Sequence, residues 1–599
     1  MLVLVNPSSM QGPGVSGLLT LKGRLPQVSS SYLLDYADID WQQQTPYSRR
    51  HQDIYWSRGN PIDEKAHVFI DQHRLAERGR NASQFTIVET GFGFGNNFLL
   101  TASRWRNLKH RGILNYIAIE NSPVSPSDLS RHYEMVRIEY SDWLLEHYPL
   151  PLNTSFVLWL EDNIRLLLIF DNATSALENL SAKVDAWYLD GFSPAKNTDL
   201  WNPRVYGRIF SRSKPGATLS TYTVAGQVRQ DLGNAGFTTS KISGFGAKAE
   251  MLAGCKPGNW EATNVAGPTV AVIGSGVAGM GCTEALKRRN LDVEQISYKD
   301  PNAASNIPQF AVYPQLGANK ERRYQFSLTA SAYTQHRNPL FHWAMLRWHS
   351  ANSVRQKRML RIAQQFPDEF IRCPDQKEIH FLQSGWLSTA AEEDYHRAKV
   401  GSIKFCENQW QVSDDGMNLI TQVDHLVIAA GIRSSALIDA PLIPVRGQAL
   451  TVRLDKHLSD MMDGDLIVIP ATDRLATVGS TFEHNSIDPD PRSSETSSLL
   501  DSLRHLLPGS SPEVLSVYVG IRAATRDRLP LVGLVPGHQR LYLCTGFGSH
   551  GATNSRLCGE FIANLICDEP AALNRAQQAM LAIDRFQLRD SRKYSPGKS

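Results

Sequence analysis

A short apolar strand that ends in an acid and runs into a glycine-rich turn is one place where this sequence could do chemistry. The run FTIVE ends at Glu89, and three glycines then alternate along a turn that precedes a predicted helix. Glycine adopts positive φ and lets a ligand approach the backbone closely, and an asparagine at the start of a helix can cap it. The pattern predicts a nucleotide site formed by Glu89, Gly91, Gly93, Gly95 and Asn97.

Acids at the ends of the next predicted strands indicate which nucleotide this turn binds. The strand YIAIE ends in Glu120, and a carboxylate there suits a ribose diol because it can accept from both hydroxyls. The run FVLWL is followed by Glu161 and Asp162, and we expect Asp162 to meet an adenine edge. The succession of glycine turn and acids is typical of a class I methyltransferase that uses S-adenosylmethionine (SAM).

The strand DAWYLD places Asp190 directly before the loop GFSPAKN. Methyl transfer is an in-line displacement, so the enzyme mainly aligns the nucleophile with the methyl group. An amine must also be unprotonated to attack, and a carboxylate can orient its N–H bonds and take up its proton. We therefore expect Asp190 to be catalytic. The alternative that Asp190 only caps the next turn stays open.

A second glycine-rich turn, GSGVAG, lies between the apolar strand TVAVI and a predicted helix. Its GxGxxG spacing admits a pyrophosphate at the helix N-terminus. Two later features favour FAD over NAD: the strand VDHLVIAAG closes on small residues, and the turn GFGSHG precedes an amphipathic helix whose N-terminus can face a reduced flavin. The predicted FAD-binding residues are Gly274, Gly276, Gly279, Gly431, Gly548, Ser549, His550 and Gly551.

The run GIRAATRDRLPLVG carries two arginines, Arg522 and Arg526, that flank small residues before a turn. Arginine is suited to bidentate capture of a carboxylate, so we expect Arg522 to be catalytic in the second half of the chain. The alternative is a pair of arginines at the surface or facing phosphate.

Length and composition fit two enzyme domains joined in one chain. With 599 residues, 42% hydrophobic and 20% charged, the sequence predicts more than one soluble globular domain. The segment Cys255–Pro268 is polar and rich in Gly and Pro, which is typical of a linker. We expect an α/β methyltransferase domain with a Rossmann-like sheet at residues 1–262. An FAD-binding Rossmann domain with an inserted α+β substrate domain is expected at residues 263–599.

Charge and cysteine usage exclude several classes of protein. The net charge of +3 is too small for nucleic-acid binding through the overall field, so such contacts require local patches. Seven scattered cysteines without a CxxC pair predict reduced thiols, a cytoplasmic protein and no zinc or other metal site. We find no signal peptide and no apolar run long enough for a membrane span. The charged end RDSRKYSPGKS is predicted to be a disordered tail.

These motifs together resemble the MnmC family of bifunctional tRNA wobble-uridine modification enzymes. In the first half the resemblance rests on HQDIYWS (from His51), ETGFGFGNNFL, DAWYLDGFSPAKNTDLW and GFGAKAEML (from Gly244). In the second half it rests on VIGSGVAG, VRGQAL (from Val445), GIRAATRDRLPLVG and GFGSHG, which are similar to flavoproteins of the glycine oxidase and D-amino-acid oxidase type. The resemblance covers nearly the whole chain.

The resemblance implies two consecutive reactions on tRNA. The FAD domain removes the carboxymethyl unit from the carboxymethylaminomethyl group of 2-thiouridine, and the SAM domain methylates the amine that remains. It implies that Arg522 holds the glycine-like carboxylate and that Asp190 handles the primary amine. The sequence departs from the family pattern at Ser297, where the second strand should end in an acid, and at Phe310, where the family has glycine.

Three candidate functions follow. The first is the bifunctional tRNA enzyme, which we expect to be monomeric. The second is an active tRNA methyltransferase whose degenerate flavin domain serves as a tRNA-binding scaffold. The third is a small-molecule amine methyltransferase fused to an amino-acid oxidase. Candidate phosphate contacts for tRNA are the basic segments at Arg104–Arg111, near Arg288 and at Arg355–Arg361.

Overall fold

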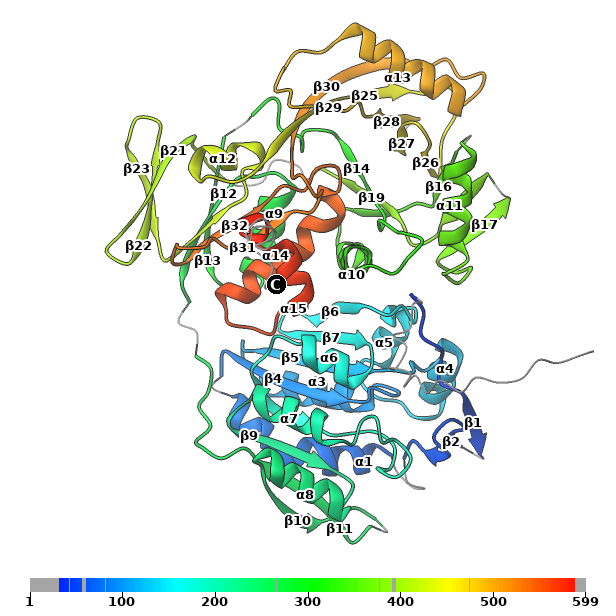
Figure 1. Ribbon diagram of the computed structural model, residues 1–599, viewed down its shortest axis with the longest axis vertical. Coiled ribbons are helices and arrows are strands. Elements are labelled where there is room, and N and C mark those ends of the chain that lie inside the picture. Colours follow the sequence, from blue (N-terminus) through cyan, green and yellow to red (C-terminus); the bar gives the residue numbers. More distant parts are fainter. Residues whose placement is uncertain are drawn as a thin grey trace, which may run out of the picture.

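The computed structural model describes residues 32–587, except for positions 43, 57–60, 81, 247, 265–266, 299, 351, 376, 390–394 and 473. The predicted disordered tail lies outside the described residues. Figure 1 shows two α/β bodies one above the other, the first half of the chain below and the second half above. In the part of the chain that the structure describes, no helix is long and apolar enough to cross a membrane.

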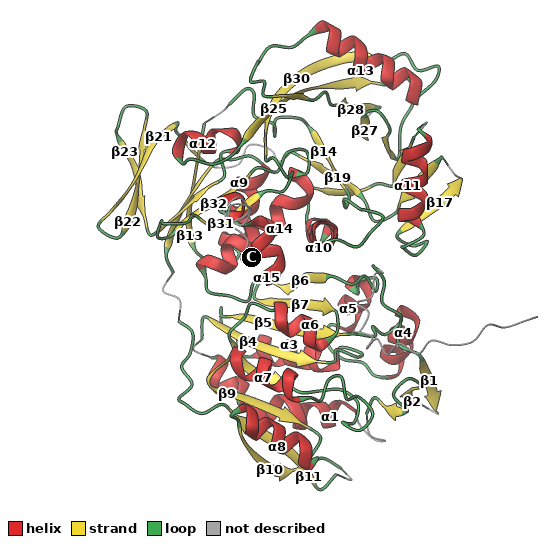
Figure 2. Cartoon of the chain, viewed as in Figure 1, coloured by secondary structure: helices red, strands yellow, loops and turns green. Residues whose placement is uncertain are grey.

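The first half is built on an eight-stranded sheet among the described residues. Its five central strands are parallel and mostly buried, because helices cover both faces of the sheet (Figure 2). In sheet order the strands are β10 (Thr238–Ser243), β11 (Glu250–Cys255), β9 (Ser213–Thr221), β8 (Val184–Tyr188), β4 (Gln84–Thr90), β5 (Ile113–Glu120), β7 (Ile164–Phe170) and β6 (Ser155–Glu161).

Helices and a small sheet complete the first half, which has the class I methyltransferase arrangement expected from the sequence. The small sheet consists of β1 (Ile39–Gln42), β2 (Thr45–Ser48) and β3 (Asp53–Ile54). The helices are α1 (Pro61–Lys65), which continues as a π-helical turn (Ala66–Ile70) and a 3-10 turn (Asp71–His73), α2 (Leu75–Gly79), α3 (Asn96–Asn107), α4 (Pro126–Met135), α5 (Ser141–His147), α6 (Ala173–Asn179), α7 (Pro203–Arg212) and α8 (Gly226–Ala235).

One predicted strand has a different place in this sheet. The run FVLWL forms β6, an edge strand antiparallel to β7, so the third parallel strand is β7 and not FVLWL. Asp162 lies in the tight turn between β6 and β7, at the end of the sheet where β5 and β7 begin. Because cofactors of such sheets bind at the carboxyl ends of the parallel strands, the expectation that Asp162 meets an adenine edge is wrong.

The second half contains a six-stranded sheet with the second glycine turn at the end of its β12 strand. All strands are parallel except β31. In sheet order they are β20 (His396–Arg397), β13 (Asp292–Ser297), β12 (Thr269–Ile273), β24 (His425–Ile428), β32 (Leu541–Thr545) and β31 (Leu531–Leu534). The helices packed near this sheet are α9 (Val277–Lys287), α10 (Arg322–Gln335), α14 (Gly551–Ile566) and α15 (Arg575–Leu581).

A larger mixed sheet forms the inserted body at the top of Figure 1. Its strands are β17 (Ile371–Asp375), β18 (Glu378–Phe381), β16 (Leu346–His349), β26 (Met461–Asp463), β27 (Ile467–Pro470), β28 (Leu475–Gly479), β25 (Ile443–Arg453) and β29 (Glu483–His484), with β30 (Glu513–Ala524) also paired to β25. The remaining helices of the second half are α11 (Ser353–Ala363), a 3-10 turn (Gly431–Arg433), α12 (Ser434–Leu437), which lies beside β21 (Val400–Cys406), and α13 (Ser493–Leu506). Two small sheets remain, β14 (Gln309–Val312), β19 (Gly385–Ser388) and β15 (Phe341–Trp343), and β21 (Val400–Cys406), β22 (Gln409–Asp414) and β23 (Leu419–Val423).

A buried cluster of charges joins the two halves. Arg165 of β7 lies within 3.4 Å of Glu560 and 3.9 Å of Glu569, both from the second half. Arg289 binds the same two glutamates at 2.6 Å each, and Arg288 stacks on Trp159 of the first half. Because Arg288 and Arg289 serve this interface, the expectation of a phosphate contact in this segment is wrong.

Candidate active sites

The first glycine turn has the backbone conformation that the sequence predicted. Gly91, Gly93 and Gly95 have φ of +96°, +52° and +79°, a region that favours glycine. A Cβ at Gly95 would lie 2.7 Å from Leu144, whereas one at Gly93 would meet only the Tyr55 ring, at 3.7 Å. The turn at Gly93 therefore leaves room for a ligand to approach the backbone.

A cluster of five polar side chains lies beneath this turn. Asn97 of α3 donates to Glu89 at 2.5 Å and to Asp190 at 3.0 Å. Tyr116 of β5 donates to Glu89 at 2.9 Å, and Lys65 forms an ion pair with Asp190. Burial, and after it the nearby Asp190 carboxylate, raise the pKa of Glu89 to about 8. The cluster thus holds one carboxyl group that is mostly protonated near neutral pH.

The cluster also retains an acceptor that fits a cationic ligand. The Oδ1 atom of Asn97 is buried and has no hydrogen-bond partner among the described residues. It lines a small cleft together with Glu120 and Asp190. The α-ammonium group of SAM could donate to it, and the sulfonium would lie among acidic side chains. These residues therefore fit SAM, and SAM supplies the methyl group when it is bound.

Glu120 ends β5 and supports the turn that it faces. Its carboxylate accepts the backbone N–H of Gly93 at 3.0 Å and that of Ser122 at 2.8 Å. Burial raises its pKa, while these backbone donors lower it. The structure thus places Glu120 at the turn, as the sequence predicted. Asp171, after β7, occupies the strand end that the prediction gave to Asp162, and its backbone N–H donates to the backbone carbonyl oxygen of Glu120 at 3.1 Å.

The loop after Asp190 is held by the HQDIYWS segment. Asp53 accepts the backbone N–H of Ser193 at 3.0 Å, and the His51 ring stacks on Phe192 with centroids 4.6 Å apart. Tyr55 meets the same Phe192 ring edge-on at 4.9 Å. Asp190 itself accepts the backbone N–H of Gly191 at 2.9 Å, so a capping contact exists beside the contacts to Asn97 and Lys65. The structure gives Asp190 a rigid loop and an aromatic wall.

Lys65 and Asp53 are site residues that sequence reasoning missed. Lys65 lies far from Asp190 in the sequence, on a five-residue helix without strong periodicity. Asp53 lies in the HQDIYWS segment, which carried the family resemblance but no assigned role. The one sequence signal for Asp53 was therefore the resemblance, and Lys65 had none.

The second site is a cavity of about 1420 Å³ lined by the second glycine turn, the 3-10 turn at Gly431 and the start of α14. A Cβ at Gly274 would lie 2.4 Å from the carbonyl oxygen of Ala429, and one at Gly279 would lie 1.9 Å from that of Gly274. A Cβ at Gly276 would lie 2.8 Å from the Ser305 hydroxyl. Because α9 starts at the next residue, its N-terminus faces a cavity that side chains do not fill.

The second helix N-terminus at the cavity is that of α14. Gly548, Ser549, His550 and Gly551 all line the cavity, and Gly548 has φ of +55°. Burial lowers the pKa of His550 to about 4, so its imidazole is neutral at pH 7. Gly431 has φ of +56° and an open Cβ direction. Two helix N-termini at one long cavity fit a dinucleotide with an anionic pyrophosphate, such as FAD.

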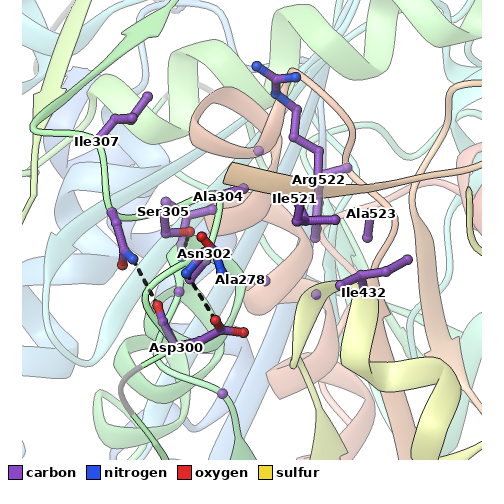
Figure 3. A pocket seen from close by; sticks show the side chains of 18 of the residues that line it. Ala278, Asp300, Asn302, Ala304, Ser305, Ile307, Ile432, Ile521, Arg522 and Ala523 are labelled. Carbon is purple, nitrogen blue, oxygen red and sulfur yellow. Dashed lines mark hydrogen bonds between the residues drawn. The ribbon is translucent and has the colours of Figure 1, made fainter. Parts of the chain in front are cut away.

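The two departures from the family pattern lie at the wall of this cavity. Ser297 ends β13 and accepts a hydrogen bond from Ser275 at 2.9 Å. Asp300, whose contacts with the Asn302 segment appear in Figure 3, forms an ion pair with Arg433 at 2.9 Å. Phe310 of β14 lies against the apolar group around Leu387 and also lines the cavity. A carboxylate is thus present near the strand end, three residues beyond Ser297.

Arg522 extends from β30 into the same cavity, away from Ile521 and Ala523 (Figure 3). Its guanidinium donates to the Ser480 hydroxyl and, at 3.4 Å, to the carbonyl oxygen of Thr481. Burial lowers its pKa to about 10, so Arg522 stays charged at pH 7. Among the described residues no carboxylate lies within ion-pair distance of it. A half-buried cation that faces a cavity in this way favours an anionic ligand.

Gly447 lies next to the Arg522 guanidinium, whereas the second arginine of the motif, Arg526, lies elsewhere. Gly447 of β25 lies opposite, and a Cβ there would be 2.4 Å from the guanidinium nitrogens, so only glycine leaves room for Arg522. Arg526 does not share the cavity wall, since its guanidinium lies over the Phe586 ring at 4.3 Å. The two arginines of the motif therefore have different environments, and Arg522 alone faces the cavity.

Two family models match the chain. One is described as S-adenosyl-L-methionine-dependent methyltransferase and matches residues 137–257. The other is described as FAD dependent oxidoreductase and matches residues 394–565. The first half is thus a SAM-dependent methyltransferase domain, and the second is an FAD-dependent oxidoreductase domain.

Curated relatives match nearly the whole chain. The "tRNA 5-methylaminomethyl-2-thiouridine biosynthesis bifunctional protein MnmC" of Marinobacter nauticus is 31% identical, covering 90% of this chain and 96% of that protein. The protein of the same name from Ralstonia nicotianae is 30% identical over 91% and 96%. Among solved structures, glycine oxidase from Geobacillus kaustophilus covers 53% of this chain and 98% of its own, with 17% identity and a TM-score of 0.45.

Proposed function

Because the chain belongs to the MnmC family of bifunctional proteins, we propose that its two halves act in succession on one tRNA wobble uridine. The FAD-dependent half removes the carboxymethyl unit from 5-carboxymethylaminomethyl-2-thiouridine. The SAM-dependent half then methylates the amine to give 5-methylaminomethyl-2-thiouridine. The observation that supports this proposal most strongly is Arg522, a half-buried cation at the FAD cavity without a carboxylate partner among the described side chains.

In the oxidation, Arg522 would hold the substrate carboxylate by a two-pronged pair of hydrogen bonds. FAD supplies a two-electron acceptor for the CH–NH group when it is bound. The C–H bond next to the carboxylate breaks, and water hydrolyses the resulting imine to free the amine and release the carboxymethyl unit as glyoxylate. Ser480 and Thr481 hold the guanidinium in position, so the carboxylate is oriented before the bond breaks.

In the methylation, Asp190 would orient the primary amine and accept its proton. Lys65 and Asn97 hold the carboxylate of Asp190 from two sides, which fixes its direction. The His51–Phe192 stack and the Tyr55 ring cover one side of the loop. Deprotonation of the ammonium leaves a lone pair for in-line attack on the methyl group, and the proton moves to the Asp190 carboxylate.

We further propose that tRNA contacts basic side chains on α11. Lys357, Arg358 and Arg361 are exposed on this helix, as the sequence predicted for this segment. Cationic side chains on one helix face suit a phosphate backbone. We also propose a cytoplasmic monomer, with domains at residues 1–262 and 263–599 as expected from the sequence.

The experiment follows the wobble nucleoside through both reactions. Full-length protein is incubated with FAD and tRNA that carries 5-carboxymethylaminomethyl-2-thiouridine, with or without SAM, and the nucleosides are identified by mass. We expect the aminomethyl nucleoside without SAM and the methylaminomethyl nucleoside with it. Methylation of aminomethyl tRNA without any removal of the carboxymethyl unit would instead support the scaffold function of the second half.

The same purified protein also tests the third candidate function, a small-molecule amine methyltransferase fused to an amino-acid oxidase. Activity on free amino acids and small amines, with no change in tRNA, would support it. Flavin absorbance in the purified protein separates the bifunctional enzyme from the scaffold, because a degenerate cavity would hold no FAD.

A further inference from the structure

Phe482 is a large aromatic side chain that stays exposed at the wall of the FAD cavity. It follows β28, lines the cavity and is 59% exposed. The Arg522 guanidinium carbon lies over its ring, 4.6 Å from the centroid. Exposed phenylalanine gains nothing from burial on folding, so the ring has one face covered by a cation and other surface open toward the cavity.

We propose that Phe482 is the stacking platform for the pyrimidine base of the wobble uridine while Arg522 holds the carboxylate of its C5 arm. This inference rests on the proposed function and assigns a base subsite to the same cavity. Aromatic side chains bind unpaired bases by stacking in many single-stranded nucleic-acid sites. Because a uridine in a loop has both faces available once it leaves its neighbours, one face can lie on Phe482.

The length of the substrate arm limits where the base can lie. The Arg522 guanidinium covers one face of the ring, so a base on the open face has the ring between itself and the cation. The arm between C5 and the carboxyl carbon spans about 5 Å when extended, and a paired carboxylate lies roughly 4 Å from the guanidinium carbon. The base must therefore stack with C5 projecting past the ring edge, so that the arm passes beside the ring to reach Arg522.

The surroundings of the Phe482 ring indicate that it binds a base and does not serve to hold Arg522 in place. The guanidinium already binds Ser480 and Thr481, so it does not depend on Phe482 for its position. Ile487, which lines the same cavity, is 70% exposed. Two exposed apolar side chains and one half-buried cation at the same cavity match a ligand with a flat apolar face and an anionic end.

The test compares Phe482→Leu, which removes the aromatic face, with Phe482→Tyr, which keeps it. Each variant receives an anticodon stem-loop RNA with 5-carboxymethylaminomethyluridine, and removal of the carboxymethyl unit is measured. N-ethylglycine, which has the same secondary amine and carboxylate but no base, serves as the matched ligand, as substrate or competitive inhibitor. Methylation of aminomethyl RNA is the control for the other half.

We expect Phe482→Leu to raise KM for the RNA by about 5- to 150-fold, with little change in kcat. Phe482→Tyr should stay within about threefold of wild type, and the affinity for N-ethylglycine should not change in either variant. An unchanged KM in Phe482→Leu would overturn the inference, as would an equal loss for N-ethylglycine, which would show that the ring only positions Arg522. Wild-type protein that leaves the carboxymethyl unit in place would instead refute the proposed function itself.

Discussion

The raised pKa of Glu89 predicts that SAM binding depends on pH. A pKa of about 8 means that roughly one Glu89 in ten is ionised at pH 7 and one in a hundred at pH 6. SAM carries a sulfonium and an α-ammonium group, and a cation beside a carboxyl group favours its ionised form. If SAM binds the ionised form, its affinity should fall about tenfold for each pH unit below 8, which equals about 1.4 kcal/mol per unit.

Calorimetry measures this effect in two ways. The dissociation constant for SAM is determined from pH 6 to pH 8.5, and the heat of binding is compared in buffers with different ionisation enthalpies. Wild type should release about 0.9 proton per SAM at pH 7. The α-ammonium group of SAM titrates in the same pH range and contributes equally in both proteins. Glu89→Gln is therefore the control, since the difference between the two proteins reports Glu89 alone. Equal pH slopes for wild type and Glu89→Gln would refute the reasoning.

The other predictions concern one residue each. Asp190→Asn should lower methyl transfer at least 100-fold while SAM still binds, and near-normal turnover of aminomethyl tRNA would contradict its role. Gly93→Val should abolish SAM binding in calorimetry, since a β-branched residue resists φ of +52°. Arg522→Lys keeps the charge but loses the fork, so it should slow carboxymethyl removal at least tenfold and leave methylation unchanged. Arg289→Met should lower the free energy of unfolding by about 3–5 kcal/mol, whereas Lys183→Met, at an exposed ion pair across the same interface, should change it by less than about 1 kcal/mol.

The sequence predicted the parts of the fold that depend on local patterns. Both glycine turns lie between a strand and a helix. They could be predicted because positive φ at Gly91 and close packing at Gly279 both favour glycine, which the sequence shows directly. The Rossmann-like sheets follow from apolar strands separated by helices. The placement of Asp190 at a strand end followed for the same reason.

What the sequence could not predict depends on strand direction and on long-range contacts. Nothing local shows that β6 and β7 form an antiparallel hairpin, so Asp162 was given a position that Asp171 holds instead. The pairing of Lys65 with Asp190 joins elements distant in the chain. The basic run at Arg288 and Arg289 looks like a surface patch until the fold brings buried glutamates to it.

Contacts near the interface between the halves indicate which residues pack on each domain. Thr263 pairs with Gln84 of β4 as an isolated bridge and accepts from Lys214 at 2.7 Å, so its contacts are with the first half, one residue beyond the boundary expected at 262. If the two halves are separated, the second half loses its contact with Arg165 but retains two cations and two anions. These are Arg288, Arg289, Glu560 and Glu569. Arg165 in turn becomes an ordinary hydrated side chain in an isolated first half. The buried charges therefore favour a fixed contact in the whole protein without making either half depend on the other for charge balance, and the contacts of Thr263 add this residue to those that pack on the first half.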